Sequence, residues 1–245
     1  MDSKSIDIDP KAYARAGGIA YLIIIVVGFL GEMFIRNTII VSGSAAATAK
    51  NILASPMLWR VGIAGDLVMH LCDMIVLMVM YTLLKPVNRN LALLMMLFNV
   101  IQTAVLVANK MNLMTPLFLS GDADYLKALD PAQLQALAYV AIKSHAYGFS
   151  NGLIYFGCAC LISGYLIFKS GYFPKIIGVM MQIAGSCYLV NSFALIVAPT
   201  FADRLFPFIL LPAFVAEISL CLWLIIKGVK LSKWKETTGA LYLGV

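Results

Sequence analysis

The sequence alternates long runs of apolar residues with short polar segments along almost its whole length. Several apolar runs reach 18 or more residues, enough for an α-helix to cross the hydrocarbon core of a bilayer. The pattern therefore predicts an all-α fold, a polytopic integral membrane bundle of six transmembrane helices. The predicted spans are about residues 17–35, 60–84, 91–113, 146–168, 175–198 and 205–228.

The six spans are expected to form one transmembrane domain over residues 1–235, followed by a tail over residues 236–245. The connection after span one is polar and small-residue-rich, and it suggests a short surface helix that stops at Pro56. No internal repeat is visible in the pattern, and no segment has the composition of a soluble domain.

Span four is predicted to begin outside the membrane. Asp130 followed by Pro131 is typical of the start of a helix, and a helical pattern continues from there to Lys169. Roughly 38 residues at 1.5 Å each make about 57 Å, well beyond a hydrocarbon core of about 30 Å. We therefore expect an outward extension of this helix over residues 131–145.

Two local features predict packing and shape. Gly148 and Gly152 form a GxxxG pattern, which predicts that Gly152 lies against a neighbouring helix. In span six, Pro212 removes a backbone hydrogen bond and is expected to kink the helix one turn before Glu217.

Composition supports the membrane class and sets an orientation. Of the residues, 62% are hydrophobic and only 12% are charged, too few charges to cover a soluble domain of this size. The net charge of +6 does not indicate a nucleic-acid partner, because the basic residues lie mainly in short connections and near the chain end. Their alternation places both termini in the cytoplasm (N-in/C-in), with the lipid bilayer as the expected partner.

Span two carries ionisable residues inside its apolar run. Asp66, His70 and Asp73 fall on one face of the predicted helix, within an arc of roughly 60°. Ionisable groups are costly in hydrocarbon, so they usually face the bundle interior or a water-filled cavity. This face is the strongest functional signal in the sequence.

Polar residues of the other spans fall at compatible depths, which predicts an acidic pocket in the outer half of the bilayer. Four acids within the spans face one clear base, so some acids should be protonated or a cation should lie among them. His70 and Asp73 are expected near the midplane together with Glu217. The predicted pocket residues are Glu32, Asp66, Asp73, Lys110, His145, Asn151, Asn191 and Glu217.

Each residue also has a plainer interpretation. Asp66 and Glu217 could pair only to fix the helix register, and His70 could be a neutral imidazole that packs in the core. Lys110 lies close enough to its helix end to extend towards the outer headgroups.

A search for chemistry-bearing motifs finds no metalloprotease, nucleophile-elbow, phosphate-loop or dinucleotide pattern, and no residue is assigned a catalytic role. Asp66, His70 and Asp73 supply ligand types at i, i+4 and i+7, the spacing of a candidate divalent-cation site. A haem between the two histidines is disfavoured, because His70 is expected at least one and a half turns deeper than His145.

Several stretches resemble a known family. GIAGDLVMHLCD, LKPVNRNLALL, DPAQLQALA and LLPAFVAEISLCLWLIIKGVK, in this order, are similar to the bacterial membrane family called domain of unknown function 4386. The resemblance covers about Tyr13 to Lys230 and implies a multi-pass protein of the cytoplasmic (inner) membrane of a bacterium, in a family with no established activity. Four residues fall on recurring polar positions of that family: Asp66, Asp73, His145 and Glu217. His70 falls where the family more often has an apolar residue, which argues against a mechanism that needs His70.

Three hypotheses for function follow. The leading one is a protein that binds or transports a small polar, cationic or amphipathic ligand in the acidic pocket. The second is an intramembrane enzyme that acts on a lipid, with or without a metal ion. Its metal ligands or acid–base groups would be Asp66, Asp73, His145 and Glu217. The third is a structural or partner-binding membrane protein whose polar groups only stabilise packing. The sequence assigns neither the ligand nor the oligomeric state.

Overall fold

The computed structural model describes residues 9–242 of the 245-residue chain. Every regular element in that range is helical. In chain order these are α1 (Pro10–Leu30), η1 (Gly31–Arg36), α2 (Asn37–Ile39), α3 (Ala45–Ala54), α4 (Pro56–Leu84), α5 (Arg89–Asn109), α6 (Met111–Leu119), η2 (Asp124–Ala128), α7 (Pro131–Ser170), α8 (Lys175–Val197), α9 (Pro199–Leu205), η3 (Phe208–Leu210), α10 (Leu211–Ile226) and α11 (Leu231–Tyr242). The fold is therefore all-α, as predicted.

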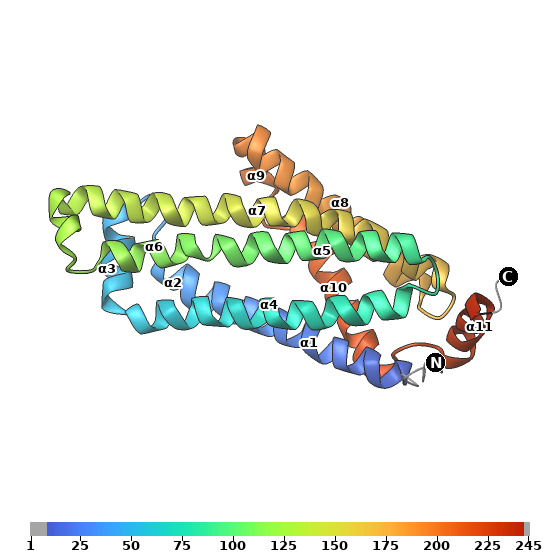
Figure 1. Ribbon diagram of the computed structural model, residues 1–245. Coiled ribbons are helices and arrows are strands. Elements are labelled where there is room, and N and C mark those ends of the chain that lie inside the picture. The colour runs from blue at the N-terminus through green and yellow to red at the C-terminus, as the bar shows by residue number, and fades with distance from the viewer. Residues whose placement is uncertain (1–8, 243–245) are drawn as a thin grey trace.

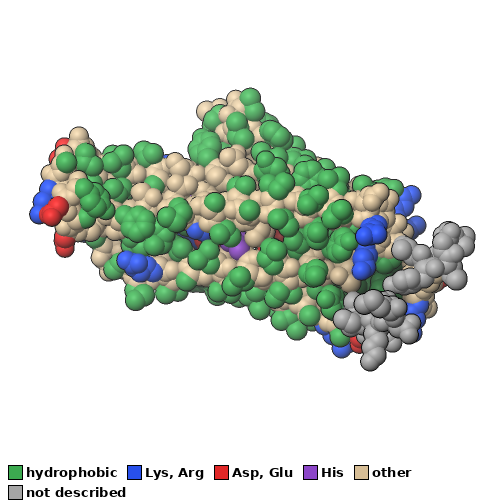
Figure 2. Space-filling model, viewed as in Figure 1, with side chains coloured by type: hydrophobic (Ala, Val, Ile, Leu, Met, Phe, Trp, Pro, Cys, Tyr) green, Lys and Arg blue, Asp and Glu red, His purple; other side chains and the backbone are tan. Residues whose placement is uncertain are grey.

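Six helical segments are long and apolar enough to cross a membrane, which confirms the number of predicted spans. They are Pro10–Ile39, Pro56–Leu84, Arg89–Leu119, Pro131–Ser170, Lys175–Val197 and Phe208–Ile226. On the face drawn in Figure 2, the charged side chains gather mainly towards the two ends of the elongated molecule, and the coloured side chains between the ends are mostly hydrophobic. This distribution suits a body whose sides face lipid.

Local sequence explains where the long helix α7 begins and ends. The side chain of Asp130 accepts a hydrogen bond from the Gln133 amide, and the Gln133 side chain accepts one from the Asp130 amide, a complete capping box. Gly171 ends the helix with a φ of 72°, a left-handed conformation that favours glycine. The helix has 40 residues, and its first part corresponds to the predicted extension over residues 131–145.

The predicted sixth span differs from the structure at its start. Residues 199–205 form the separate helix α9, and α10 begins only at Leu211 with Pro212 in its first turn. Pro212 therefore lies just after the junction of η3 (Phe208–Leu210) and α10, and not in the middle of a continuous α-helix as predicted. Proline is well tolerated in the first turn of a helix, because the amide hydrogen that it lacks has no partner there. The predicted tail is helical as far as Tyr242, and residues 243–245 lie outside the described range.

The six spans form a closed ring in which each helix packs on two neighbours, in the order α1, α4, α5, α7, α8, α10 and back to α1. Figure 1 shows α4, α5 and α7 running side by side along the body, while α8 leans outward and leads to the projecting helix α9. The start of α1 lies near α11 at one end of the body, here called the α11 end. The opposite end, where α3 lies and α7 begins, is called the α3 end.

Glycines allow the closest helix contacts of the ring. A Cβ atom on Gly164 would lie 2.5 Å from the carbonyl oxygen of Gly178, and one on Gly185 would lie 2.6 Å from that of Gly157. The backbones of α7 and α8 therefore touch at two levels. A Cβ on Gly152 would lie 2.6 Å from Leu106 of α5, which confirms that this glycine faces a neighbouring helix.

Polar contacts tie the ring together at both ends. At the α3 end, the indole nitrogen of Trp59 donates to the carbonyl oxygen of Leu113 at 2.8 Å. Towards the α11 end, the hydroxyl of Tyr172, in the turn after α7, donates to the carbonyl oxygen of Leu83 at 2.6 Å. Burial raises the pKa of Tyr172, so its hydroxyl keeps the proton that this hydrogen bond requires.

Candidate functional site

The ring of six spans encloses a cavity of about 190 Å³, here called the central cavity. Every one of the six helices contributes to its lining, and most lining side chains are apolar. The polar exceptions include the two acids Asp73 of α4 and Glu217 of α10, which sequence analysis had placed near the midplane. A mostly apolar cavity with a few converging polar groups is the usual form of a small-molecule site.

Asp73 reaches the cavity from α4 and retains an exposed side-chain fraction of 24%. Its Oδ2 atom accepts a long hydrogen bond of 3.4 Å from the hydroxyl of Thr103 on α5. The same oxygen lies 3.8 Å from Nδ1 of His70, which is beyond hydrogen-bond distance. This carboxylate is thus only weakly satisfied by the chain itself.

Glu217 reaches the cavity from the opposite side, on α10, and is half-buried. The hydroxyl of Tyr188 on α8 donates a hydrogen bond to its Oε1 atom. Within residues 9–242, neither Glu217 nor Asp73 forms an ion pair with a lysine or an arginine. Two acids therefore face the same cavity without a fixed cation.

His70 lines the cavity one turn before Asp73 on the same helix, and it is only 5% exposed. Neither ring nitrogen forms a hydrogen bond with any other group in the described part of the chain.

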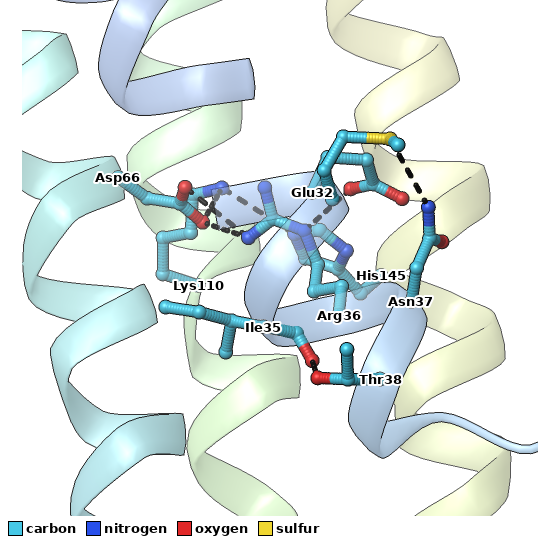
Figure 3. Close-up of polar contacts among 9 residues, drawn as sticks. Glu32, Ile35, Arg36, Asn37, Thr38, Asp66, Lys110 and His145 are labelled. Atoms are coloured by element: carbon cyan, nitrogen blue, oxygen red, sulfur yellow. Dashed lines mark hydrogen bonds and ion pairs between the residues drawn. The ribbon is translucent and has the colours of Figure 1, made fainter. Parts of the chain in front are cut away.

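Asp66 belongs to a different arrangement, here called the ion cluster: Glu32, Arg36, Asp66, Lys110 and His145. Asp66 is 1% exposed and accepts hydrogen bonds from Lys110 Nζ at 2.8 Å and from Arg36 Nη1 at 3.0 Å. Arg36 Nε also donates to Glu32 at 2.6 Å, and Lys110 Nζ lies 3.4 Å from Nε2 of His145. Figure 3 shows both cations pointing at Asp66, with Glu32 and His145 beside them. Two acids and two bases make the cluster neutral.

The ion cluster corrects two expectations. Asp66 does not line the central cavity with Glu217, because Lys110 and Arg36 already occupy its carboxylate. Lys110 does not extend towards the headgroups, since it is 5% exposed and turns inward to Asp66. Because Asp66 is buried, it needs these cations: without them its charge would be uncompensated in a low-dielectric region.

Arg36 is the residue of the ion cluster that sequence analysis missed. The predicted first span ended at residue 35, but the helix continues through the π-helical turn η1 and α2 to Ile39. The available signal was the spacing of Glu32 and Arg36, four residues apart and therefore on the same face of a helix. A π-helical turn inside a long helix re-aims side chains and is frequently found at functional sites.

The ion cluster lies one helical turn from the central cavity, towards the α3 end. Asp66 precedes the cavity-lining His70 by four residues on α4, and Lys110 follows the cavity-lining Leu106 by four on α5. His145 likewise precedes Phe149 of the cavity by four, and the two rings stack at 6.5 Å between centroids. Three helices thus place the cluster directly beyond the cavity.

The remaining predicted site residues lie elsewhere. Asn151 is exposed on the outer surface of α7, and Asn191 is buried on α8 but is not among the cavity-lining residues. The proposed cation set of Asp66, His70 and Asp73 does not converge. Within the described residues, no group of three or more His, Cys, Asp or Glu side chains is arranged to hold a metal ion.

Comparison with known proteins identifies a family but no activity. An uncharacterised protein of the archaeon Archaeoglobus fulgidus is 28% identical to this chain over 175 residues, which are 71% of this chain and 88% of that protein. No solved structure matches the chain. The model of the family described as Domain of unknown function (DUF4386) matches residues 16–228. This multi-pass membrane protein therefore belongs to the DUF4386 family.

Proposed function

We propose that this membrane protein binds a small amphipathic cation in the central cavity. The observation that carries the proposal is the pair of carboxylates, Asp73 and Glu217, which line the cavity without a lysine or arginine partner in residues 9–242. Two ionised acids in a low-dielectric interior are unfavourable unless they are protonated or a cation lies between them. A cationic ligand would supply the missing charge.

Size and lining limit the ligand further. A cavity of roughly 150 Å³ holds a benzene molecule, whereas drug-sized ligands need about 300 Å³ or more. At about 190 Å³, the central cavity suits one ring with a short chain. Its walls include Phe156 and several methionines, which favour an apolar body on the ligand. The chemistry is that of a primary amine attached to a small apolar group.

The ion cluster supports the proposal by contrast. In the ion cluster, two acids pair with two bases of the same chain, so the net charge of the cluster is zero without a ligand. Two turns further along α4, Asp73 accepts only a long hydrogen bond from the Thr103 hydroxyl within the described residues, and Glu217 on α10 accepts one from the Tyr188 hydroxyl. Binding of this kind would also be the first step of transport, if the cavity opens in turn to the two sides of the membrane.

Isosteric probes of different charge test the proposal by isothermal titration of the detergent-purified protein. We expect phenethylamine to bind more tightly than neutral 2-phenylethanol, and phenylacetate not to bind. Asp73→Asn and Glu217→Gln should each weaken phenethylamine binding by about tenfold or more, since a hydrogen bond to a charged group contributes about 1.5–3 kcal/mol.

The matched controls are Asp124→Asn and Glu236→Gln, which remove exposed acids from outside the cavity and should leave the affinity unchanged. Equal affinity for the amine and the alcohol would refute the proposal. So would unaltered phenethylamine binding in both cavity variants.

A further inference from the structure

We infer that His70 is the specificity-determining residue of the central cavity and selects amines that carry a hydroxyl on the carbon next to the aminomethyl group. The ligand class is therefore a vicinal amino alcohol with an apolar substituent. This inference rests on the proposed function and adds to it the second polar group of the ligand.

The first observation is that His70 has no partner for either ring nitrogen in the described part of the chain, although it is only 5% exposed. Buried polar side-chain atoms are nearly always hydrogen-bonded, because an unsatisfied one loses its hydration without compensation. A neutral imidazole offers one donor and one acceptor. The ring lines the central cavity, although neither nitrogen is itself exposed there, so a small turn of the imidazole would bring a nitrogen to a molecule in the cavity.

The second observation is that neither of the two acids nearest to His70 on α4 forms a hydrogen bond with its ring. Asp66, one turn before His70 on α4, is held by Lys110 and Arg36. Asp73 lies 3.8 Å from the imidazole and accepts its hydrogen bond from Thr103 instead. The partner of His70 is therefore expected from the cavity and not from the protein.

The spacing of His70 and Asp73 defines the geometry of the ligand. Their facing atoms, Nδ1 and Oδ2, are too far apart to bond one another but close enough for one small ligand to contact both. An ammonium group can donate only, so it suits the carboxylate of Asp73. A hydroxyl can donate and accept, so it suits the imidazole in either tautomer. Two groups on adjacent carbons meet both requirements.

The experiment compares phenethylamine with 2-amino-1-phenylethanol, which differs only by the hydroxyl, using titration calorimetry on the purified protein. We expect the amino alcohol to bind about tenfold more tightly. Because the hydroxyl-bearing carbon is a stereocentre, we also expect one enantiomer to bind more tightly than the other. Both results are obtained with the unaltered protein.

Variants then assign the preference to His70. His70→Phe keeps an aromatic ring but removes both nitrogens, and it should bind the two amines equally while retaining affinity for phenethylamine. His70→Gln keeps a donor and an acceptor and should retain part of the preference. The control is His145→Phe, which alters the other histidine one turn beyond the cavity and should leave the preference unchanged.

The outcomes separate this inference from the proposed function. If both amines bind more tightly than 2-phenylethanol but equally to each other, the inference is refuted and the proposed function stands. Equal binding of the two enantiomers, or a preference that survives in His70→Phe, also refutes it. If neither amine binds more tightly than 2-phenylethanol, both the proposed function and the inference fail.

Discussion

Asp66 shows what a single buried side chain contributes to this protein. It is 1% exposed, and it is the shared acceptor of Lys110 from α5 and Arg36 from the end of the first span. A buried ion pair contributes little net stability compared with an apolar substitute, but removing one partner leaves an uncompensated charge in a low-dielectric region. Removal of one charged partner should therefore destabilise the protein more than replacement of the whole pair by apolar residues.

The first residue-scale prediction follows from that asymmetry. Asp66→Asn should lower the free energy of unfolding by about 3–5 kcal/mol, because it leaves Lys110 and Arg36 without their shared counter-charge. The measurement is the melting temperature of the detergent-solubilised protein. The double variant Asp66→Asn/Lys110→Met should recover part of the loss, since it also removes one of the uncompensated cations.

The exposed pair Asp124–Lys127 provides the control, and Asp124→Asn should melt like the unaltered protein. An Asp66→Asn variant that melts at the same temperature or higher would show that the ion cluster does not hold the ring together.

At the scale of elements, α7 and α8 differ from the other helix pairs described above because their backbones are in direct contact. Gly164 faces the carbonyl of Gly178, and Gly185 faces that of Gly157, so no side chain can move aside to make room. Gly152 differs, since the nearest atom to a new Cβ is the mobile end of the Leu106 side chain. Van der Waals contact of this kind drives helix association in lipid, where the hydrophobic effect between helices is lost.

The corresponding prediction contrasts two substitutions of equal size. Gly164→Ala should lower the melting temperature clearly more than Gly152→Ala, because a backbone carbonyl cannot rotate away as a leucine side chain can. Gly239→Ala in α11, where a new Cβ meets no atom within 4 Å, is the control and should cause no loss. Equal melting of the Gly164 and Gly152 variants would mean that α7 and α8 are farther apart than described.

At the scale of the whole molecule, the closed ring brings together residues that lie far apart in the sequence. Asp73 and Glu217 face one cavity because α10 packs against α1, and α1 packs against α4. The start of α1 and the helix α11 lie at the same end of the body, as an even number of spans requires (Figure 1). Which side of the membrane that end faces is decided by charge: the positive-inside rule predicts the cytoplasm.

Topology reporters test that orientation. Fusions at Asn51 and Asp124, in α3 and η2, should report an exported location, and fusions after Asn88 and at the end of α11 should report the cytoplasm. The physical reason is that Lys85, Arg89 and Lys175 lie at helix ends beside the connections at the α11 end. An exported signal from a fusion at the end of α11 would reverse the orientation.

The sequence by itself determined the all-α class, the six spans and the long extended helix, because these depend on local properties: apolar run length, caps and helix-breaking residues. It also indicated that Asp73 and Glu217 lie near the midplane, since depth follows from position along a span. The sequence did not place Arg36 in the first span, because hydropathy does not fix where a helix ends. In the structure the helix continues past the apolar run through a π-helical turn and α2.

Only the tertiary structure decided which polar groups meet. Asp66 and Asp73 lie on one face of α4, yet one is held in the ion cluster and the other faces the cavity. The difference arises because Arg36 and Lys110, from two other helices, reach the level of Asp66 but not that of Asp73. Pairing energies depend on distances between helices, and those distances come from ring closure and glycine contacts that no single span encodes.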